Sequence, residues 1–329
     1  MHLEDIVTTA VLAARAAVSV LLPRQALDTS PTQSQMKPHG DLEQYRKYVT
    51  GNLNGTTLIV PIPLTRAREI LPKEYEFLDG AAWQSMLPDF PSDKYPLMVT
   101  AVYDHDVGSK GYGVSTSDFH RASFEFPFVD RLGDRYSAFR WTGTMMITAN
   151  HIAVRGARLY GITAIPSLFE PLNDAYAGES DGEATFYAES KAEQGKSMLS
   201  IRSWPHLHNI PYPIEFIRNV TNQPTFGGPR HCDRYIRLFN TSLTENDAFA
   251  PVPVTADIKA QLAPVTASED AVEYRGVYGW RLSTAFVEPI HPWKCDQLAG
   301  YAGTGPGDSS PPGPPKELRR EPFSSDEMR

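Results

Sequence analysis

The sequence predicts an α+β protein that is mostly β, folded as a closed or bent antiparallel β-barrel with a few short helices. Two observations carry this prediction. Short runs rich in β-branched and aromatic residues recur along the chain with glycine and proline between them, and helical patterns are few and short. Many short strands with regular turn punctuation are typical of barrels and bent pairs of sheets.

The clearest strand signal is an alternation in which Phe124, Phe126 and Phe128 are separated by Glu125 and Pro127, the period of a half-buried strand. Glycine-containing residues 193–196 separate two further strand patterns and predict a hairpin there. The other strand patterns span residues 57–61, 97–103, 136–149, 185–188, 197–204, 235–239 and 277–287. Helical patterns span residues 42–49, 65–71, 214–220 and 256–262.

Length and composition predict one main folded unit. A chain of 329 residues with 41% hydrophobic content can bury a substantial core. We expect residues 1–40 to form a helix-like segment and a flexible linker, and residues 41–298 to form the β domain. Residues 299–329 are rich in proline and glycine, which predicts a disordered tail because so little apolar surface can be buried there.

Charge and motifs exclude several classes of partner and cofactor. The net charge of −8 and the pI of about 5.6 argue against a nucleic-acid partner. No apolar run is long enough to span a bilayer, and no nucleotide-binding glycine motif occurs, so we expect neither a membrane span nor a cofactor. His206 and His208 alternate, but a third and fourth ligand are not evident, so no metal is expected.

The N-terminal sequence and the cysteines are informative about the cellular location of the protein. The apolar stretch 6–22 follows Glu4 and Asp5 and is interrupted by Arg15, which is unlike a signal peptide. A cytoplasmic protein is therefore expected, with secretion as the alternative and homo-oligomerisation left open. Two cysteines, Cys232 and Cys295, exclude a disulfide framework and leave a single bridge open.

The most informative stretch is a glycine pair, Gly156 and Gly161, which follows the strand pattern of residues 136–149 and precedes Pro166. Glycines placed in this way predict a turn or a close backbone approach. Together with the proline-containing run 58–63, the segment 68–72 and the late segment 276–287, this order resembles the acetoacetate decarboxylase superfamily. The resemblance spans roughly residues 55–290.

The resemblance implies a glycine-rich turn beside a Schiff-base lysine, and here the chain departs from the family. Where the family has Pro-Lys-Lys, this chain reads Thr163-Ala-Ile, so the amine falls at Ala164 or Ile165. The family's glutamate maps approximately onto Arg121. Lys191 and Lys196 are alternative amines, although solvated turn lysines are the simpler interpretation.

Without the lysine, we expect catalysis to rest on other groups. Arg121 and Arg158 are predicted to clamp a carboxylate or enolate and to stabilise developing negative charge, with ordinary ion pairs as the alternative. Arg155 is a third, weaker candidate. His120 is expected to move protons, since it adjoins Arg121.

Four residues are predicted to bind the substrate: Tyr160, Gly161, Tyr278 and Trp280. The aromatic members would surround an apolar cavity if both glycine segments approach the barrel mouth, and plain core packing is the alternative. The cluster of His231, Cys232 and Asp233 is poor as a nucleophile site because adjacent residues on a strand cannot converge.

Taken together, the sequence predicts a diverged decarboxylase or other lyase acting on a small or polyketide-derived keto or carboxylated substrate in secondary metabolism. The alternative is a small-molecule-binding or scaffold protein that kept the barrel and lost the chemistry.

Overall fold

A computed structural model of the chain describes residues 43–178, 182–192, 196–206, 208–239, 249–266 and 270–299. The N-terminal segment predicted for residues 1–40 and nearly all of the predicted tail lie outside these residues. The strands are β1 (Tyr48–Pro63), β2 (Glu76–Phe77), β3 (Lys94–Ser109), β4 (Val114–Ser115), β5 (Phe119–Asp130), β6 (Ala138–Trp141), β7 (Thr144–Thr148), β8 (Thr163–Glu170), β9 (Ala177–Gly178), β10 (Ala184–Ser190), β11 (Met198–Pro205), β12 (Thr225–Phe226), β13 (His231–Cys232), β14 (Ile236–Leu238), β15 (Val252–Gln261), β16 (Val272–Pro289) and β17 (Trp293–Lys294). The helices are α2 (Leu64–Ile70), α3 (Ala81–Gln84), α4 (His151–Leu159) and α5 (Ile214–Asn222), with 3-10 turns η1 (Glu43–Tyr45), η2 (Lys110–Tyr112) and η4 (Cys295–Leu298).

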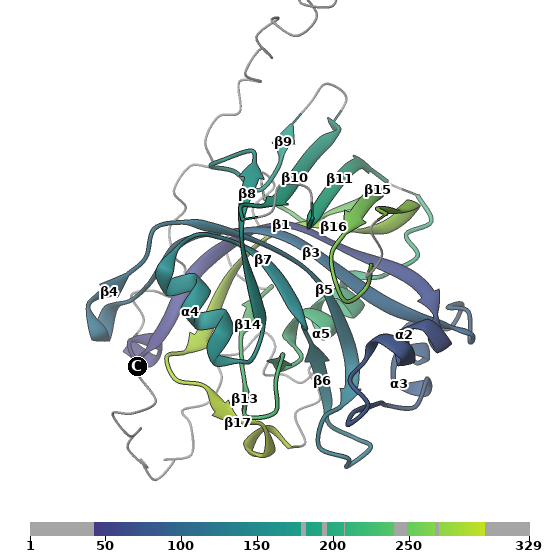
Figure 1. Cartoon of the computed structure of the whole chain (residues 1–329), viewed down its shortest axis with the longest axis horizontal. Helices are drawn as coiled ribbons and strands as arrows, with labels where there is room; N and C mark the ends of the chain where they lie inside the picture. The colour runs from purple at the N-terminus through teal and green to yellow at the C-terminus, as the bar shows by residue number, and fades with distance from the viewer. Residues whose placement is uncertain are drawn as a thin grey trace, which may run out of the picture.

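Within the described part of the chain, nine strands close into a barrel in the order β5, β7, β8, β10, β11, β15, β16, β1 and β3, and β3 pairs back to β5. The mostly β fold class and the closed barrel predicted from sequence are thereby confirmed (Figure 1). The barrel is not antiparallel throughout, because β7 and β8 run parallel. Parallel neighbours need a crossover connection, and α4 provides it over the outer face of the barrel.

Side-chain alternation sorts each barrel strand into an inner and an outer face. On β5, Ala122 and Phe124 belong to the large buried core inside the barrel, together with Phe186 of β10 and Ile201 of β11. Residues 121, 123 and 125 of β5 therefore point outward. On β5 and its neighbours this outer face is itself covered, so that polar groups on it are withdrawn from solvent.

The cover consists of α4 and the segment that carries α5, β13 and β14 (Figure 1). Helix α4 begins at Asn150, whose side-chain Oδ1 accepts hydrogen bonds from the backbone N–H groups of Ile152 (3.0 Å) and Ala153 (3.3 Å). The Asn150 amide also donates to Thr116 Oγ1 at 2.8 Å, which ties the start of the helix to the end of β4. On the other side, β14 pairs antiparallel with β16.

The sequence located the strands better than the helices. The predicted hairpin is confirmed by the antiparallel pairing of β10 and β11, although its tip at residues 193–195 lies outside the described residues. Helices α2 and α5 match the predictions for residues 65–71 and 214–220. The predicted helix 256–262 is wrong: it is strand β15, whose inner residues Ala256, Ile258 and Ala260 pack into the barrel core.

Residues 42–49 were also predicted to be helical and instead contain the short turn η1 and the beginning of β1. Helix α4 was not predicted, because Gly156 inside it reads as a turn signal. Of the two glycines of this pair, Gly161 has a positive φ, of 78°, and Gly156 does not.

A disulfide joins Cys232 of β13 to Cys295 of η4, and β13 pairs with β17 beside it. The two cysteines are 63 residues apart, so the bond closes a long loop and restricts the unfolded chain.

We expect the double substitution Cys232→Ala/Cys295→Ala to lower the free energy of unfolding by about 3 kcal/mol. Urea unfolding of the wild type and the double variant without reductant measures the loss. Dithiothreitol should destabilise the wild type and leave the variant unchanged. Equal urea midpoints of the two proteins without reductant would contradict this prediction.

Candidate functional site

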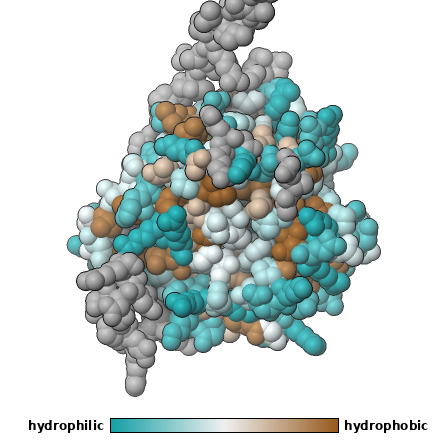
Figure 2. All heavy atoms as spheres, viewed as in Figure 1, coloured by the Kyte–Doolittle hydropathy of each residue, from teal (hydrophilic) through white to brown (hydrophobic). Residues whose placement is uncertain are grey.

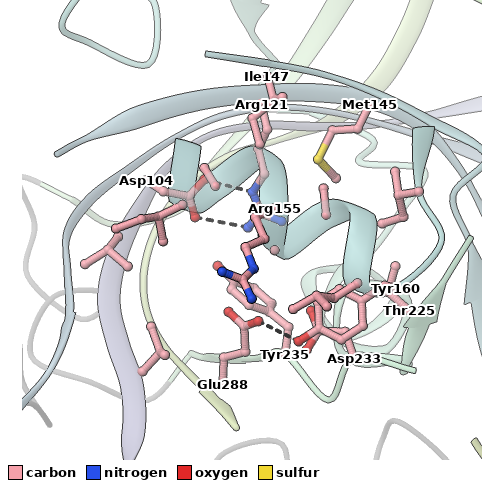
Figure 3. Close-up of a pocket in the computed structure, with 18 of the residues that line it drawn as sticks. Asp104, Arg121, Met145, Ile147, Arg155, Tyr160, Thr225, Asp233, Tyr235 and Glu288 are labelled. Carbon is pink, nitrogen blue, oxygen red and sulfur yellow. Dashed lines mark hydrogen bonds and ion pairs between the residues drawn. The ribbon is translucent and has the colours of Figure 1, made fainter. Parts of the chain in front are cut away.

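A cavity of about 370 Å³ lies between the outer face of the barrel and α4. Its deeper wall carries charged and hydroxyl side chains: Asp104, Arg121, Glu125, Arg140, Tyr160, Asp233, Tyr235 and Glu288. Its outer part is lined by apolar residues of β4, α4 and the segment after β16. The polar residues of the deeper wall come from four strands, β3, β5, β6 and β16, and from the segments that follow α4 and β13 (Figure 3), so the cavity exists only in the folded chain.

Arg121 reaches this cavity, as the sequence predicted, but its guanidinium is already paired. It donates to both carboxylate oxygens of Asp104, from Nε at 2.8 Å and from Nη2 at 3.0 Å. It also lies over the ring of Tyr235, 4.8 Å from the centroid. Burial alone would lower the pKa of Arg121, but Asp104 more than offsets this, so the pKa is raised and the charge is retained.

A second buried ion pair joins Arg140 of β6 to Glu125 of β5. Arg140 Nε lies 2.8 Å from Glu125 Oε2, and both residues are only 4% exposed. Glu125 Oε1 accepts hydrogen bonds from the hydroxyls of Thr100 (2.8 Å) and Ser123 (2.7 Å). Burial raises the pKa of Glu125, but Arg140 and the two hydroxyls outweigh it, so the pKa lies below its ordinary value and the carboxylate is charged.

Two acidic side chains, Asp233 and Glu288, form what we call the carboxyl pair. Tyr160 donates its hydroxyl hydrogen bond to Glu288 Oε1 at 2.9 Å and also contacts the Asp233 carboxyl. Burial raises the pKa of Asp233 well above its ordinary value, and the neighbouring Glu288 charge raises it further. Burial also raises the pKa of Glu288. The pair therefore holds a proton at a pH where ordinary carboxyl groups have lost theirs.

Glycine positions Tyr160 at this wall. Gly161, with its positive φ, packs so closely on the next loop that a Cβ would lie 2.5 Å from the backbone nitrogen of Gly228. In return, the N–H groups of Gly227 and Gly228 donate to the Tyr160 carbonyl at 2.8 Å and 3.1 Å. Gly161 does not line the cavity; its contribution is to let the Tyr160 backbone dock.

Arg155 is the third arginine of the cavity. It projects from α4 towards Glu288 and Tyr235 in Figure 3. Among the described residues, its guanidinium has no hydrogen bond or ion pair, unlike those of Arg121 and Arg140. Arg155 therefore lines the cavity with a guanidinium that no other described side chain engages.

The structure does not bring Arg158 and His120 to this cavity. Arg158 is exposed on α4 and, unlike Arg155 on the same helix, does not line the cavity. His120 points to the inner face of β5, opposite Arg121, where it stacks on Phe169 with 4.9 Å between ring centroids. Its Nε2 lies 2.7 Å from the Asp174 carbonyl, and burial lowers its pKa.

Tyr278 and Trp280 also lie elsewhere. They precede Glu288 by ten and eight residues on β16, which places Trp280 roughly 25 Å along the strand from the carboxyl pair. Trp280 donates its indole N–H to the Tyr212 carbonyl at 2.8 Å, and Tyr278 packs against His206. Both are packing residues in this structure. The alternative amines Lys191 and Lys196 are exposed, and none of the lysines that the structure describes lines the cavity.

Within the described residues, no group of three metal-ligating side chains is close enough to hold an ion. No described helix is long and apolar enough to cross a bilayer.

Comparison with known proteins gives matches among solved structures alone. No protein-family model matches the chain, and no curated protein matches it in sequence. An acetoacetate decarboxylase-like enzyme from Sphingomonas wittichii matches at 9% identity and a TM-score of 0.49, over 76% of this chain and 94% of that chain. The chain is similar in structure to acetoacetate decarboxylase-like proteins.

Two further matches are of the same kind. The enduracididine biosynthesis enzyme MppR, complexed with pyruvate, has a TM-score of 0.46 at 9% identity, over 77% of this chain and 90% of that chain. Acetoacetate decarboxylase from Legionella pneumophila has a TM-score of 0.40 at 10% identity, over 75% and 88%. At these identities no residue's role is carried over from these proteins to this chain.

Sequence reasoning found Arg121, Tyr160 and Arg155 and missed most of their neighbours. Glu288 gave no local signal, because it follows a long apolar strand as an ordinary terminal charge. Asp233 was noticed in the wrong context, as part of a cluster with His231 and Cys232. The sequence could have indicated Glu288 as an acidic residue at the end of a barrel strand. Its proximity to Asp233 could not be predicted, because it depends on the pairing of β14 with β16.

Proposed function

We propose that this protein is a lyase that acts on a small keto or carboxylated substrate bound in the cavity, using acid–base and electrostatic catalysis in place of an imine. The observation that carries the proposal is the carboxyl pair, held by the Tyr160 hydroxyl at the wall of a cavity into which Arg155 projects. An acid that retains its proton, placed across from a cation, is the arrangement that carbonyl chemistry needs.

The charges of the cavity wall favour an anionic substrate. Arg121 and Arg140 are matched by Asp104 and Glu125, while Arg237, which is 3% exposed, lies behind them with a hydrogen bond to Thr57 Oγ1 at 3.3 Å. With one proton on the carboxyl pair, the charged side chains that line the wall balance, and Arg237 behind the wall gives the site a net positive charge. Among the described residues, Arg155 is the arginine of this lining whose charge has no carboxylate partner. Such a site binds a carboxylate and stabilises an enolate.

For a β-keto carboxylate the roles are as follows. The bond between the carboxylate carbon and its neighbour breaks, CO₂ leaves, and the electron pair passes into an enolate. The Arg155 guanidinium binds the oxygen on which that charge develops. The carboxyl pair then delivers its proton to the carbon and regains one from solvent, so atoms and charge balance.

Turnover of a substrate panel tests the proposal. Purified protein is incubated with acetoacetate, longer 3-oxo acids and 2-oxo acids, and CO₂ release above the spontaneous rate is measured along with the products by mass spectrometry. Borohydride added during turnover should leave the protein mass unchanged, because no imine forms. Binding without turnover of any member would leave the non-catalytic alternative, a binding protein on the same fold.

Arg155 gives a specific prediction. Arg155→Gln should raise the KM or Kd for a carboxylate about tenfold to a hundredfold, because a charge-assisted contact is lost. The control is Arg68→Gln, which removes an exposed arginine from α2, away from the cavity. Equal affinity of the two variants would remove Arg155 from the site.

The disulfide is informative about the cellular location of the protein. Disulfides persist in oxidising compartments, so the Cys232–Cys295 bond favours the secreted alternative over the cytoplasmic one. Mass spectrometry of alkylated protein from its source measures whether the bond is formed there.

A further inference from the structure

The outer half of the cavity differs in chemistry from its inner wall. Three large apolar side chains lie at this end and are unusually exposed: Val114 of β4 (51%), Ile152 (57%) and Leu159 (42%) of α4. Ile290 and Pro292, after β16, line the cavity with them. We call these five residues the apolar mouth. On the face that carries α4, hydrophobic side chains are visible between hydrophilic ones (Figure 2).

The mouth is continuous with the polar wall, because both line one cavity. Ile152 and Leu159 are seven residues apart on α4 and so lie on one face of it, with Arg155 between them. An apolar surface that is exposed and contiguous with a charged pocket indicates a ligand that is apolar at one end and anionic at the other.

The size of the cavity also favours a ligand with an apolar part. At about 30 Å³ per non-hydrogen atom, the share of a water molecule in the liquid, a cavity of about 370 Å³ holds roughly a dozen such atoms. A three- or four-carbon keto acid fills about half of that space. The cavity therefore has room for about as many atoms again, and the five residues of the apolar mouth line it together with the polar wall.

We propose that the ligand of this cavity is an amphipathic acid of medium chain length, whose carboxylate or keto acid head meets Arg155 and the carboxyl pair while its aliphatic tail lies on the apolar mouth. The inference rests on the site of the proposed function and specifies its substrate class. It does not require turnover, since the fit depends on shape and polarity alone.

Binding of stable straight-chain carboxylates, from butanoate to tetradecanoate, tests the proposal by isothermal titration calorimetry on the full chain. We expect Kd to fall by about threefold to fourfold per added methylene and to level off near decanoate, which has the size of the cavity. Decanol, which has the tail without the charge, should bind at least tenfold more weakly than decanoate.

Variants separate the tail from the head. Ile152→Ser/Leu159→Ser should abolish most of the chain-length dependence and leave butanoate binding unchanged. Both side chains are largely exposed, so little folding stability is lost. The matched control is Leu172→Ser, which removes a leucine that is 73% exposed and does not line the cavity.

The outcomes are distinguishable from those of the proposed function. A Kd that does not change with chain length would overturn the amphipathic ligand, even if short keto acids are turned over. Chain-length-dependent binding with no turnover of any 3-oxo acid would uphold the ligand class and overturn the lyase. Equal effects of the mouth variant and of Leu172→Ser would show that the mouth does not contact the tail.

Discussion

Glu288→Gln is expected to reduce turnover by about 10² to 10⁴, the range for removal of a positioned general acid or base. The substitution keeps the shape of the side chain and its ability to accept the Tyr160 hydrogen bond, but it removes the titratable group whose charge raises the pKa of Asp233. Steady-state rates on the best substrate of the panel measure the effect. Affinity for a carboxylate should change far less, because Arg155 remains.

Glu74→Gln serves as the control, since Glu74 is exposed and distant from the cavity lining. If Glu288→Gln unfolds more easily than the wild type, Tyr160→Phe provides a second route, because it removes the hydroxyl that orients the pair. Wild-type rates in both folded variants would show that the carboxyl pair does not act in the reaction.

The same pair predicts a pH dependence. Because the reaction uses its proton, the rate should fall as pH rises through the raised pKa values of Asp233 and Glu288. The free energy of unfolding should also fall as pH rises. The unfolded chain releases its protons near the ordinary pKa values of 3.8 and 4.5, whereas the folded protein holds a proton up to the raised pKa values. Stability is therefore lost between the ordinary and the raised pKa values. Glu288→Gln should flatten both profiles.

Arg140→Met should lower the free energy of unfolding by roughly 3–5 kcal/mol, the cost of leaving one member of a buried ion pair without its partner. Arg140 binds Glu125 and also donates to the carbonyls of Val220 (3.0 Å) and Thr221 (2.6 Å). Its removal leaves a buried carboxylate with only hydroxyl partners. Urea unfolding at neutral pH measures the change.

A double variant shows whether the charge causes the loss. Arg140→Met/Glu125→Gln removes both charges of this pair and keeps an acceptor for the Thr100 and Ser123 hydroxyls, so it should be more stable than Arg140→Met alone. Arg68→Met, on the surface of α2, should change stability by less than about 0.5 kcal/mol. A double variant less stable than the single one would contradict the electrostatic explanation.

The barrel was predictable because strand signals are local. Alternation around Phe124 and Phe126 reflects residues that face the core, and it is visible without any knowledge of partners. The prediction of a helix at residues 256–262 failed because Ala256, Ile258, Ala260 and Leu262 alternate as a strand while their neighbours also suit a helix. Tertiary pairing with β11 and β16 decided that segment.

The turn at Tyr160 and Gly161 is the part of the candidate site that the sequence pattern indicated directly. Gly161 and Tyr160 stood out because glycine near a strand end signals unusual backbone geometry, and the structure gives Gly161 a positive φ and a close contact with Gly228. Arg158 and Arg155 could not be told apart by sequence, since the face of a helix that meets a cavity depends on what packs beside it. His120 and Arg121 are neighbours in sequence and lie on opposite sides of the sheet.

The sequence by itself determined most of the strands and the mostly β class, because these follow from local pattern and composition. The tertiary structure alone decided that Asp233 and Glu288 meet at Tyr160, that Asp104 pairs with Arg121, and that Cys232 bonds to Cys295. These contacts join positions far apart in the chain, and closing a barrel fixes which strand ends become neighbours in a way no local signal records.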